Sequence, residues 1–142
     1  MKSANLTALK LVLCIVCISH LIIGGLGVMP FLSIADLVAV IYKAKFAMTP
    51  QLEHVARMLA GYMLTIGLLA SLALRDPLRN VSIIYGIIVL LSIRVIQMVS
   101  FRSRVSEVFG IPMGWYWAQA ILFSLLVIGL IYFKPREEKS GK

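Results

Sequence analysis

The sequence predicts an all-α protein: a four-helix transmembrane bundle with a short interfacial or re-entrant segment between the first two helices. Hydrophobic residues make up 61% of the 142 residues, above the ~45–50% of soluble domains. Mean hydropathy is +0.96. Charged residues make up only 14% and gather between long apolar runs. We therefore expect most of the chain to face lipid.

Four apolar runs are long enough to cross a bilayer, which takes ~20 helical residues. They cover residues 11–29, 55–74, 81–99 and 115–133. The first and fourth carry no formal charge, and the other two carry one arginine each. Only a helix pairs its own backbone groups within one segment in hydrocarbon, and the alternation of a barrel strand is absent. Residues 1–142 are thus expected to form one multi-pass membrane domain.

The connection between the first two spans is too polar to cross the membrane. Within it, residues 31–42 are apolar except for Ser33 and Asp36. This segment is too short for a span, but it suits a helix that lies at the interface or dips back into the bilayer. Thr49 and Pro50 then fit the N-cap and the first helical position of the second span.

The connection between the second and third spans is the shortest. Asp76 and Pro77 predict the N-cap and first turn of the third span, so the second and third spans should form a tight antiparallel hairpin. The third span is expected to continue past the membrane through residues 100–105 and to be separated from the fourth by the break at 109–115. Residues 134–142 are expected to be a short solvated tail.

Basic residues are distributed unevenly over this topology, and the positive-inside rule therefore places both termini in the cytoplasm. Eight lie on the side of the termini, and four lie on the other side. The first group is Lys2, Lys10, Arg75, Arg79, Lys134, Arg136, Lys139 and Lys142, and the second is Lys43, Lys45, Arg102 and Arg104. The net charge of +8 thus indicates topology and attraction to anionic lipid, with no nucleic acid as partner.

A cleaved signal peptide is an alternative interpretation of residues 11–29. Lys2 and Lys10 precede the apolar run, and the small residues Gly25 and Gly27 stand near its end. The run is longer than the ~7–15 apolar residues usual in a signal. Its length favours a retained helix.

Cys14, Cys17 and His20 stand three residues apart in the first span and raise the question of a metal or redox motif. A haem-attachment motif needs histidine directly after the second cysteine, where this chain has Ile18. Structural zinc takes four ligands, and a redox cysteine pair usually lies at a helix N-terminus. We expect the cysteines to act as small hydrophobes, with no metal and no cofactor.

Small residues recur four positions apart within the spans, and we interpret them as helix-packing faces. Such spacing lets the backbones of neighbouring helices approach closely in lipid. The pairs are Ala56/Ala60, Gly67/Ser71, Ser82/Gly86 and Ala120/Ser124, and Gly24 and Gly27 add a face on the first span.

Polar side chains within or near the spans are the candidates for function, because burying them in hydrocarbon is costly. They are His20, His54, Arg57, Arg94, Gln97 and Gln119. One hypothesis is an outward-facing polar pocket floored by His20, rimmed by Arg57 and Arg94, and capped by residues 31–46. The alternative is that the arginines snorkel to the headgroups while His20 bonds a neighbouring helix.

The second span opens with an arginine and continues with GYMLTIGLLASLALRD, a run of small residues and leucines. A short proline-containing turn follows, LSIRVIQ closes the third span, and GGLGVMP ends the first. In these features the chain resembles the DoxX-like group of small four-helix membrane proteins. The resemblance implies the fold. Most members have no assigned activity, and some resemble subunits associated with membrane oxidoreductases.

Enzyme signatures are missing: there is no HExxH and no glycine-rich phosphate loop, and all six carboxylates fall outside the four spans. We therefore expect a non-enzymatic accessory or lipid- or amphiphile-binding protein of the bacterial cytoplasmic (inner) membrane. Its expected partners are membrane lipids, with a membrane protein or a second copy as further candidates. The alternative is a membrane enzyme subunit or small transporter that acts on a hydrophobic substrate through His20, Arg57 and Arg94.

Overall fold

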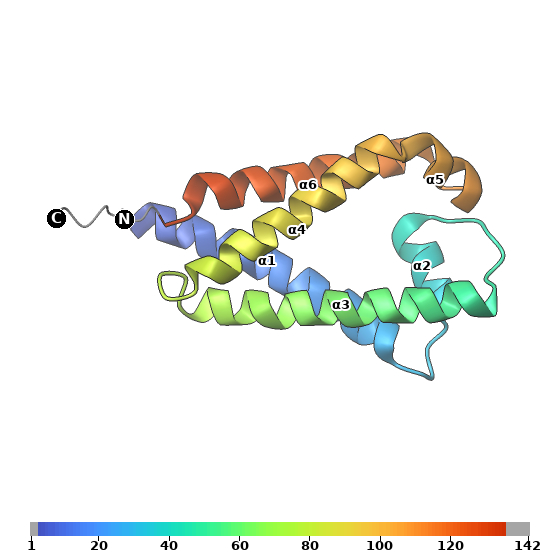
Figure 1. Ribbon diagram of the computed structural model, residues 1–142, viewed down its shortest axis with the longest axis horizontal. Coiled ribbons are helices and arrows are strands. Elements are labelled where there is room, and N and C mark those ends of the chain that lie inside the picture. The colour runs from blue at the N-terminus through green and yellow to red at the C-terminus, as the bar shows by residue number, and fades with distance from the viewer. Residues whose placement is uncertain (1–2, 136–142) are drawn as a thin grey trace.

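The computed structural model describes residues 3–135, which form six α-helices and no strand (Figure 1). The helices are α1 (Ser3–Val28), α2 (Ile34–Tyr42), α3 (Pro50–Arg75), α4 (Val81–Ser100), α5 (Arg102–Phe109) and α6 (Met113–Phe133). Four of them, α1, α3, α4 and α6, are long and apolar enough to cross a membrane. The all-α prediction and the four apolar helices are confirmed. Most of the predicted 134–142 tail lies outside the described residues.

The start of α3 matches the sequence prediction. Thr49 Oγ1 accepts a hydrogen bond from the backbone N–H of Leu52 at 3.2 Å, and Pro50 occupies the first turn. The helix therefore begins five residues earlier than the predicted span of 55–74. In the same way α1 begins at Ser3, eight residues before its predicted apolar run.

A short helix, α2, occupies most of the segment 31–42. Ser33 is its N-cap and accepts a hydrogen bond from the backbone N–H of Asp36 at 3.3 Å. Lys43 ends the helix in the left-handed region, with φ of 52°. In Figure 1 this helix lies between the C-terminal end of α4 and the N-terminal part of α3.

The turn between α3 and α4 differs from its prediction. Asp76 is not the N-cap of α4, because it lies directly after α3 and its carboxylate accepts a hydrogen bond from the Arg79 N–H at 3.1 Å. Asn80 Nδ2 donates to the Asp76 carbonyl at 2.9 Å, so a closed turn precedes Val81, the first residue of α4. From this turn the two helices diverge (Figure 1), and the predicted tight hairpin is an open V.

The end of α4 also differs from its prediction. The helix does not continue through residues 100–105, because Phe101 separates it from α5. Gly110, with φ of 60°, ends α5, and Pro112 precedes α6. The predicted break before the fourth span is therefore confirmed.

The closest helix pair is α1 with α3, and glycines on both helices permit it. A Cβ atom added to Gly24 would overlap the backbone of Leu64, and one added to Gly67 would lie 2.8 Å from the backbone nitrogen of Leu21. These contacts confirm the packing role predicted for both glycines. Gly86 on α4 has nothing within 4 Å of its Cβ position, so the packing role predicted for it is wrong.

Apolar side chains fill the bundle and also cover its outside. Leu13, Ala70, Ile84 and Leu130 bring α1, α3, α4 and α6 into one buried cluster. Large apolar side chains on the same four helices point outward, and these include Leu11, Tyr62, Ile96 and Leu125, each more than 60% exposed. Helices that are apolar on all faces are typical of membrane spans.

We expect Gly24→Ala to destabilise the bundle and Gly25→Ala to leave it intact. A methyl group at Gly24 meets the backbone of Leu64, whereas one at Gly25 meets nothing within 4 Å. Overpacking typically costs ~1–3 kcal/mol, while alanine is better than glycine by up to ~1 kcal/mol inside a helix. Thermal unfolding of both variants in detergent micelles measures the difference. Equal midpoints would contradict the backbone contact between α1 and α3.

Candidate functional site

Arg57 hydrogen-bonds the turn between α1 and α2 to the start of α3, at one end of the bundle. Its Nη1 donates to the Met29 carbonyl at 3.0 Å, and its Nη2 donates to the Leu32 carbonyl at 3.2 Å and to the Glu53 carboxylate at 2.9 Å. These bonds attach the turn between α1 and α2 to the first turns of α3. Arg57 is not among the residues that line the cavities described below, and His54 is exposed on the same helix.

A cavity of about 480 Å³ lies at the wide end of the V formed by α3 and α4, and we call it the α3–α4 cavity. Its polar lining residues are Tyr42, Arg94, Gln97, Tyr116 and Gln119. All its other lining residues are apolar, and they come from α2, α3, α4, α5 and the loops that flank α2 and α5. Three of the six predicted site residues therefore meet here.

Arg94 is the charged group of the α3–α4 cavity. Its Nη2 donates to the Tyr42 hydroxyl at 2.8 Å, and its guanidinium carbon lies 4.9 Å from the centre of the Phe123 ring. Its Nε is buried and has no hydrogen-bond partner. No carboxylate within residues 3–135 lies at ion-pair distance from it, and the ion pair of this part of the chain joins Arg57 and Glu53.

Gln119, which also lines this cavity, has an acceptor atom without a partner. Its Nε2 donates to the Ile41 carbonyl at 3.1 Å, and Trp115 Nε1 donates to that carbonyl at 2.9 Å. Because a carbonyl only accepts, this bond fixes the orientation of the amide. The Gln119 Oε1 atom is therefore turned away from Ile41, and it is buried without a partner.

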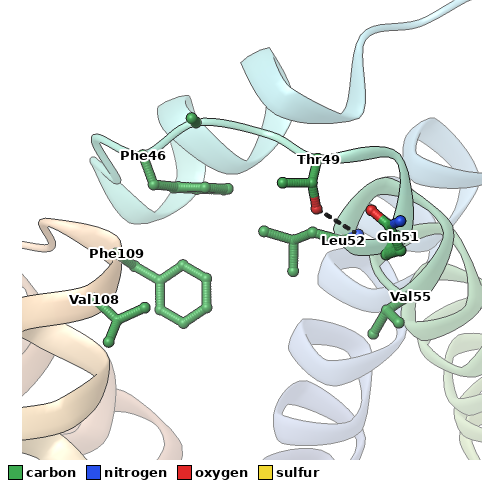
Figure 2. A pocket seen from close by; sticks show the side chains of 8 residues that line it. Phe46, Thr49, Gln51, Leu52, Val55, Val108 and Phe109 are labelled. Atoms are coloured by element: carbon green, nitrogen blue, oxygen red, sulfur yellow. Dashed lines mark hydrogen bonds between the residues drawn. The ribbon is translucent and has the colours of Figure 1, made fainter.

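The mouth of the cavity lies between α3 and α5. Figure 2 shows Leu52 and Val55 of α3 facing Phe109 and Val108 of α5, with Phe46 in the loop above them. These residues line an open hollow of about 570 Å³. Phe46, Leu52, Val55 and Phe109 line both this hollow and the α3–α4 cavity, so the two spaces adjoin between α3 and α5.

His20 lies at a second cavity of about 330 Å³, between α1 and α6, which we call the α1–α6 cavity. The residue is only 4% exposed. Its Nδ1 lies 2.9 Å from the carbonyl of Val16 on its own helix, and 3.3 Å from the hydroxyl of Ser19. The predicted bond to a neighbouring helix is therefore wrong. The carbonyl partner places the proton on Nδ1, which leaves a lone pair on Nε2 of the neutral ring.

The two cavities share Tyr42 and Gln119 as lining residues. The structure thus brings His20, Arg94, Gln97 and Gln119 into one neighbourhood and leaves His54 and Arg57 apart from it. Sequence reasoning missed Tyr42 as a site residue. Its position at the end of the short apolar segment, directly before Lys43, was the available signal.

Cations stacked on aromatic rings mark both ends of the bundle. Lys43 Nζ lies 4.3 Å from the centre of the Trp115 ring at one end, and Lys134 Nζ lies 4.4 Å from the centre of the Tyr85 ring at the other. Aromatic and basic side chains of this kind collect at membrane–water interfaces. The α3–α4 cavity therefore lies near the Lys43 end.

No family model, no curated protein and no solved structure matches this chain. The likeness to the DoxX-like group remains an expectation from the sequence. The four long apolar helices indicate an integral, multi-pass membrane protein.

We expect Arg57→Gln to loosen the turn between α1 and α2. The variant loses the bonds to the carbonyls of Met29 and Leu32, each typically worth ~1 kcal/mol or more because the donor is charged. Amide hydrogen exchange should quicken across residues 29–36, and the unfolding midpoint should fall.

The matched control for this variant is His54→Gln, three residues earlier on the same helix and exposed. We expect its exchange pattern and midpoint to match those of the wild type. Unchanged exchange in Arg57→Gln would show that the arginine does not hold the turn.

Proposed function

We propose that this protein binds an amphiphile in the α3–α4 cavity and catalyses no reaction on it. One observation carries the proposal: an apolar cavity within a membrane bundle contains an arginine that has no acidic partner within the described chain. A cavity of about 480 Å³ lies within the ~300–1,000 Å³ of small-molecule sites. A few convergent polar groups in an apolar wall are typical of such sites.

The polar and apolar linings of the cavity are arranged as an amphiphile requires. Arg94, Tyr42 and Gln119 gather beside α2, where they suit a polar head. Leu59 on α3 belongs to the apolar lining, where it suits a hydrocarbon chain. The opening between α3 and α5 gives a ligand access to the cavity.

The depth of Arg94 also supports a lipid-like ligand. The residue stands six positions before the end of α4 at Ser100, which is ~9 Å at 1.5 Å per residue. Its bonding partner Tyr42 directly precedes Lys43, which stacks on Trp115. A head bound at Arg94 would then lie just below the membrane surface, with α2 as an interfacial cap above it.

The orientation in the membrane follows from charge. Apart from Arg57 and Arg94, the basic residues within 3–135 are divided equally, with four near each end of the bundle. The asymmetry comes from Lys2, Arg136, Lys139 and Lys142, which lie outside the described residues. We propose on this basis that both termini are cytoplasmic, that the membrane is the bacterial inner membrane, and that the α3–α4 cavity faces its outer leaflet.

The second candidate function is a small transporter for a hydrophobic substrate. It is favoured by the residues shared between the two cavities, Tyr42 and Gln119, and by the Nε2 lone pair of His20 in the second cavity. In that case His20→Leu abolishes substrate movement across vesicles without reducing binding at Arg94. If the protein only binds the substrate, neither the wild type nor His20→Leu moves it across the vesicle membrane.

We expect Leu59→Trp to reduce the bound amphiphile at least tenfold, because the indole would fill a cavity that Leu59 lines. Native mass spectrometry of the purified protein measures the bound fraction. The control is Met58→Trp, which adds the same ring at a neighbouring exposed position that does not line the cavity. Equal ligand occupancy in the two variants would exclude the cavity as the binding site.

We expect a cysteine at position 43 to react with a membrane-impermeant maleimide on intact cells and one at position 79 to be protected. The substitutions are Lys43→Cys and Arg79→Cys, both at exposed positions, with Cys14 and Cys17 replaced by alanine. After permeabilisation both should react. Labelling of position 79 alone on intact cells would reverse the proposed orientation, and labelling of both would exclude a single span between the two positions.

A further inference from the structure

Two buried atoms of opposite hydrogen-bonding kind lack partners, and they belong to residues that line the same cavity. Arg94 Nε carries an N–H group and can only donate, whereas Gln119 Oε1 can only accept. Leaving such a group unpaired in a buried site is unfavourable, and few native groups do so. A ligand head that satisfies both atoms must present an acceptor oxygen and a hydrogen-bond donor together.

The charge of the site restricts the head further. A guanidinium group is permanently protonated, and no carboxylate in residues 3–135 lies at ion-pair distance from Arg94. The charge is compensated by the Tyr42 hydroxyl and by the face of Phe123, neither of which is an anion. An anionic oxygen is therefore the acceptor that this site favours.

We propose that the ligand is an anionic phospholipid with a hydroxylated head, of the phosphatidylglycerol kind; this rests on the amphiphile-binding function proposed above. A phosphate oxygen accepts from Arg94 Nε, and a head hydroxyl donates to Gln119 Oε1. The level of Arg94, next to the interfacial pair of Lys43 and Trp115, fits the depth of a phosphate rather than that of an acyl chain.

The first test compares lipids on the wild-type protein, so it does not depend on any variant that fails to fold. Detergent-purified protein is titrated with phosphatidylglycerol, phosphatidylmethanol and phosphatidylcholine of identical acyl chains, and binding is read by native mass spectrometry. Phosphatidylmethanol keeps the anionic phosphate but lacks the hydroxyls. We expect phosphatidylglycerol to bind about tenfold more tightly than phosphatidylmethanol, the effect of one buried hydrogen bond of ~1.4 kcal/mol. Equal affinities would overturn the proposal.

The second test measures the contributions of Arg94 and Gln119 to lipid binding separately. Gln119→Met removes the acceptor, and the Ile41 carbonyl keeps its bond from Trp115 Nε1. We expect this variant to bind phosphatidylglycerol and phosphatidylmethanol equally while still preferring both over phosphatidylcholine. Arg94→Leu should lose the preference for anionic lipid. A retained tenfold preference for phosphatidylglycerol in Gln119→Met would overturn the role of its oxygen.

The control for charge is Arg104→Leu, which removes one positive charge at an exposed position that does not line the cavity. This variant should still prefer phosphatidylglycerol over phosphatidylmethanol, and both of these over phosphatidylcholine.

The outcomes also separate the head-group proposal from the amphiphile-binding proposal. If Leu59→Trp blocks every lipid but the wild type does not favour the hydroxylated head, amphiphile binding holds and the head assignment is wrong. If Leu59→Trp changes nothing for any lipid, the amphiphile-binding function itself is wrong.

Discussion

The close approach of α1 and α3 is the contact on which the rest of the structure depends. Gly24 and Gly67 let the two backbones meet, and Cβ atoms at either position would collide. Without a hydrophobic drive between helices in lipid, such backbone proximity is a main source of association. Because α3 is held along α1, it cannot also follow α4, which packs on α6 instead. The hairpin between α3 and α4 therefore opens into a V (Figure 1).

The open V creates a space that the chain fills only in part. The short helix α2 and the short helix α5 occupy its wide end, and they contribute Val38, Tyr42, Val105 and Phe109 to the cluster around Met98 and Tyr116. Arg57 holds the turn that leads into α2. The α3–α4 cavity is the part of this space that the chain leaves unfilled. Its polar lining is thus a consequence of helix pairing elsewhere in the bundle, and not of a local sequence motif.

The sequence was sufficient to predict the four spans because length and apolar content define a span independently of tertiary contacts. The caps at Ser33 and Thr49 were local too, and the second was predicted from the residues alone. Which helices pack together could not be predicted from the local sequence. The short connection after Arg75 suggested a hairpin, and nothing in it shows that α3 prefers α1. The same limit applies to Arg57, whose acceptors are carbonyls 25 and 28 residues away.

Residue type alone also did not predict which hydrogen-bond partners the polar side chains have. Arg57 and Arg94 look equivalent in the sequence, since each is a lone arginine near the end of a span. Arg57 donates to an acid and to carbonyls in the turn between α1 and α2, and its hydrogen-bonding capacity is largely used within the protein. Arg94 has one neutral partner, one aromatic face and a buried Nε without a partner. A membrane bundle gains no stability from leaving that donor unpaired, and the incomplete bonding of Arg94 is the observation on which the proposed ligand rests.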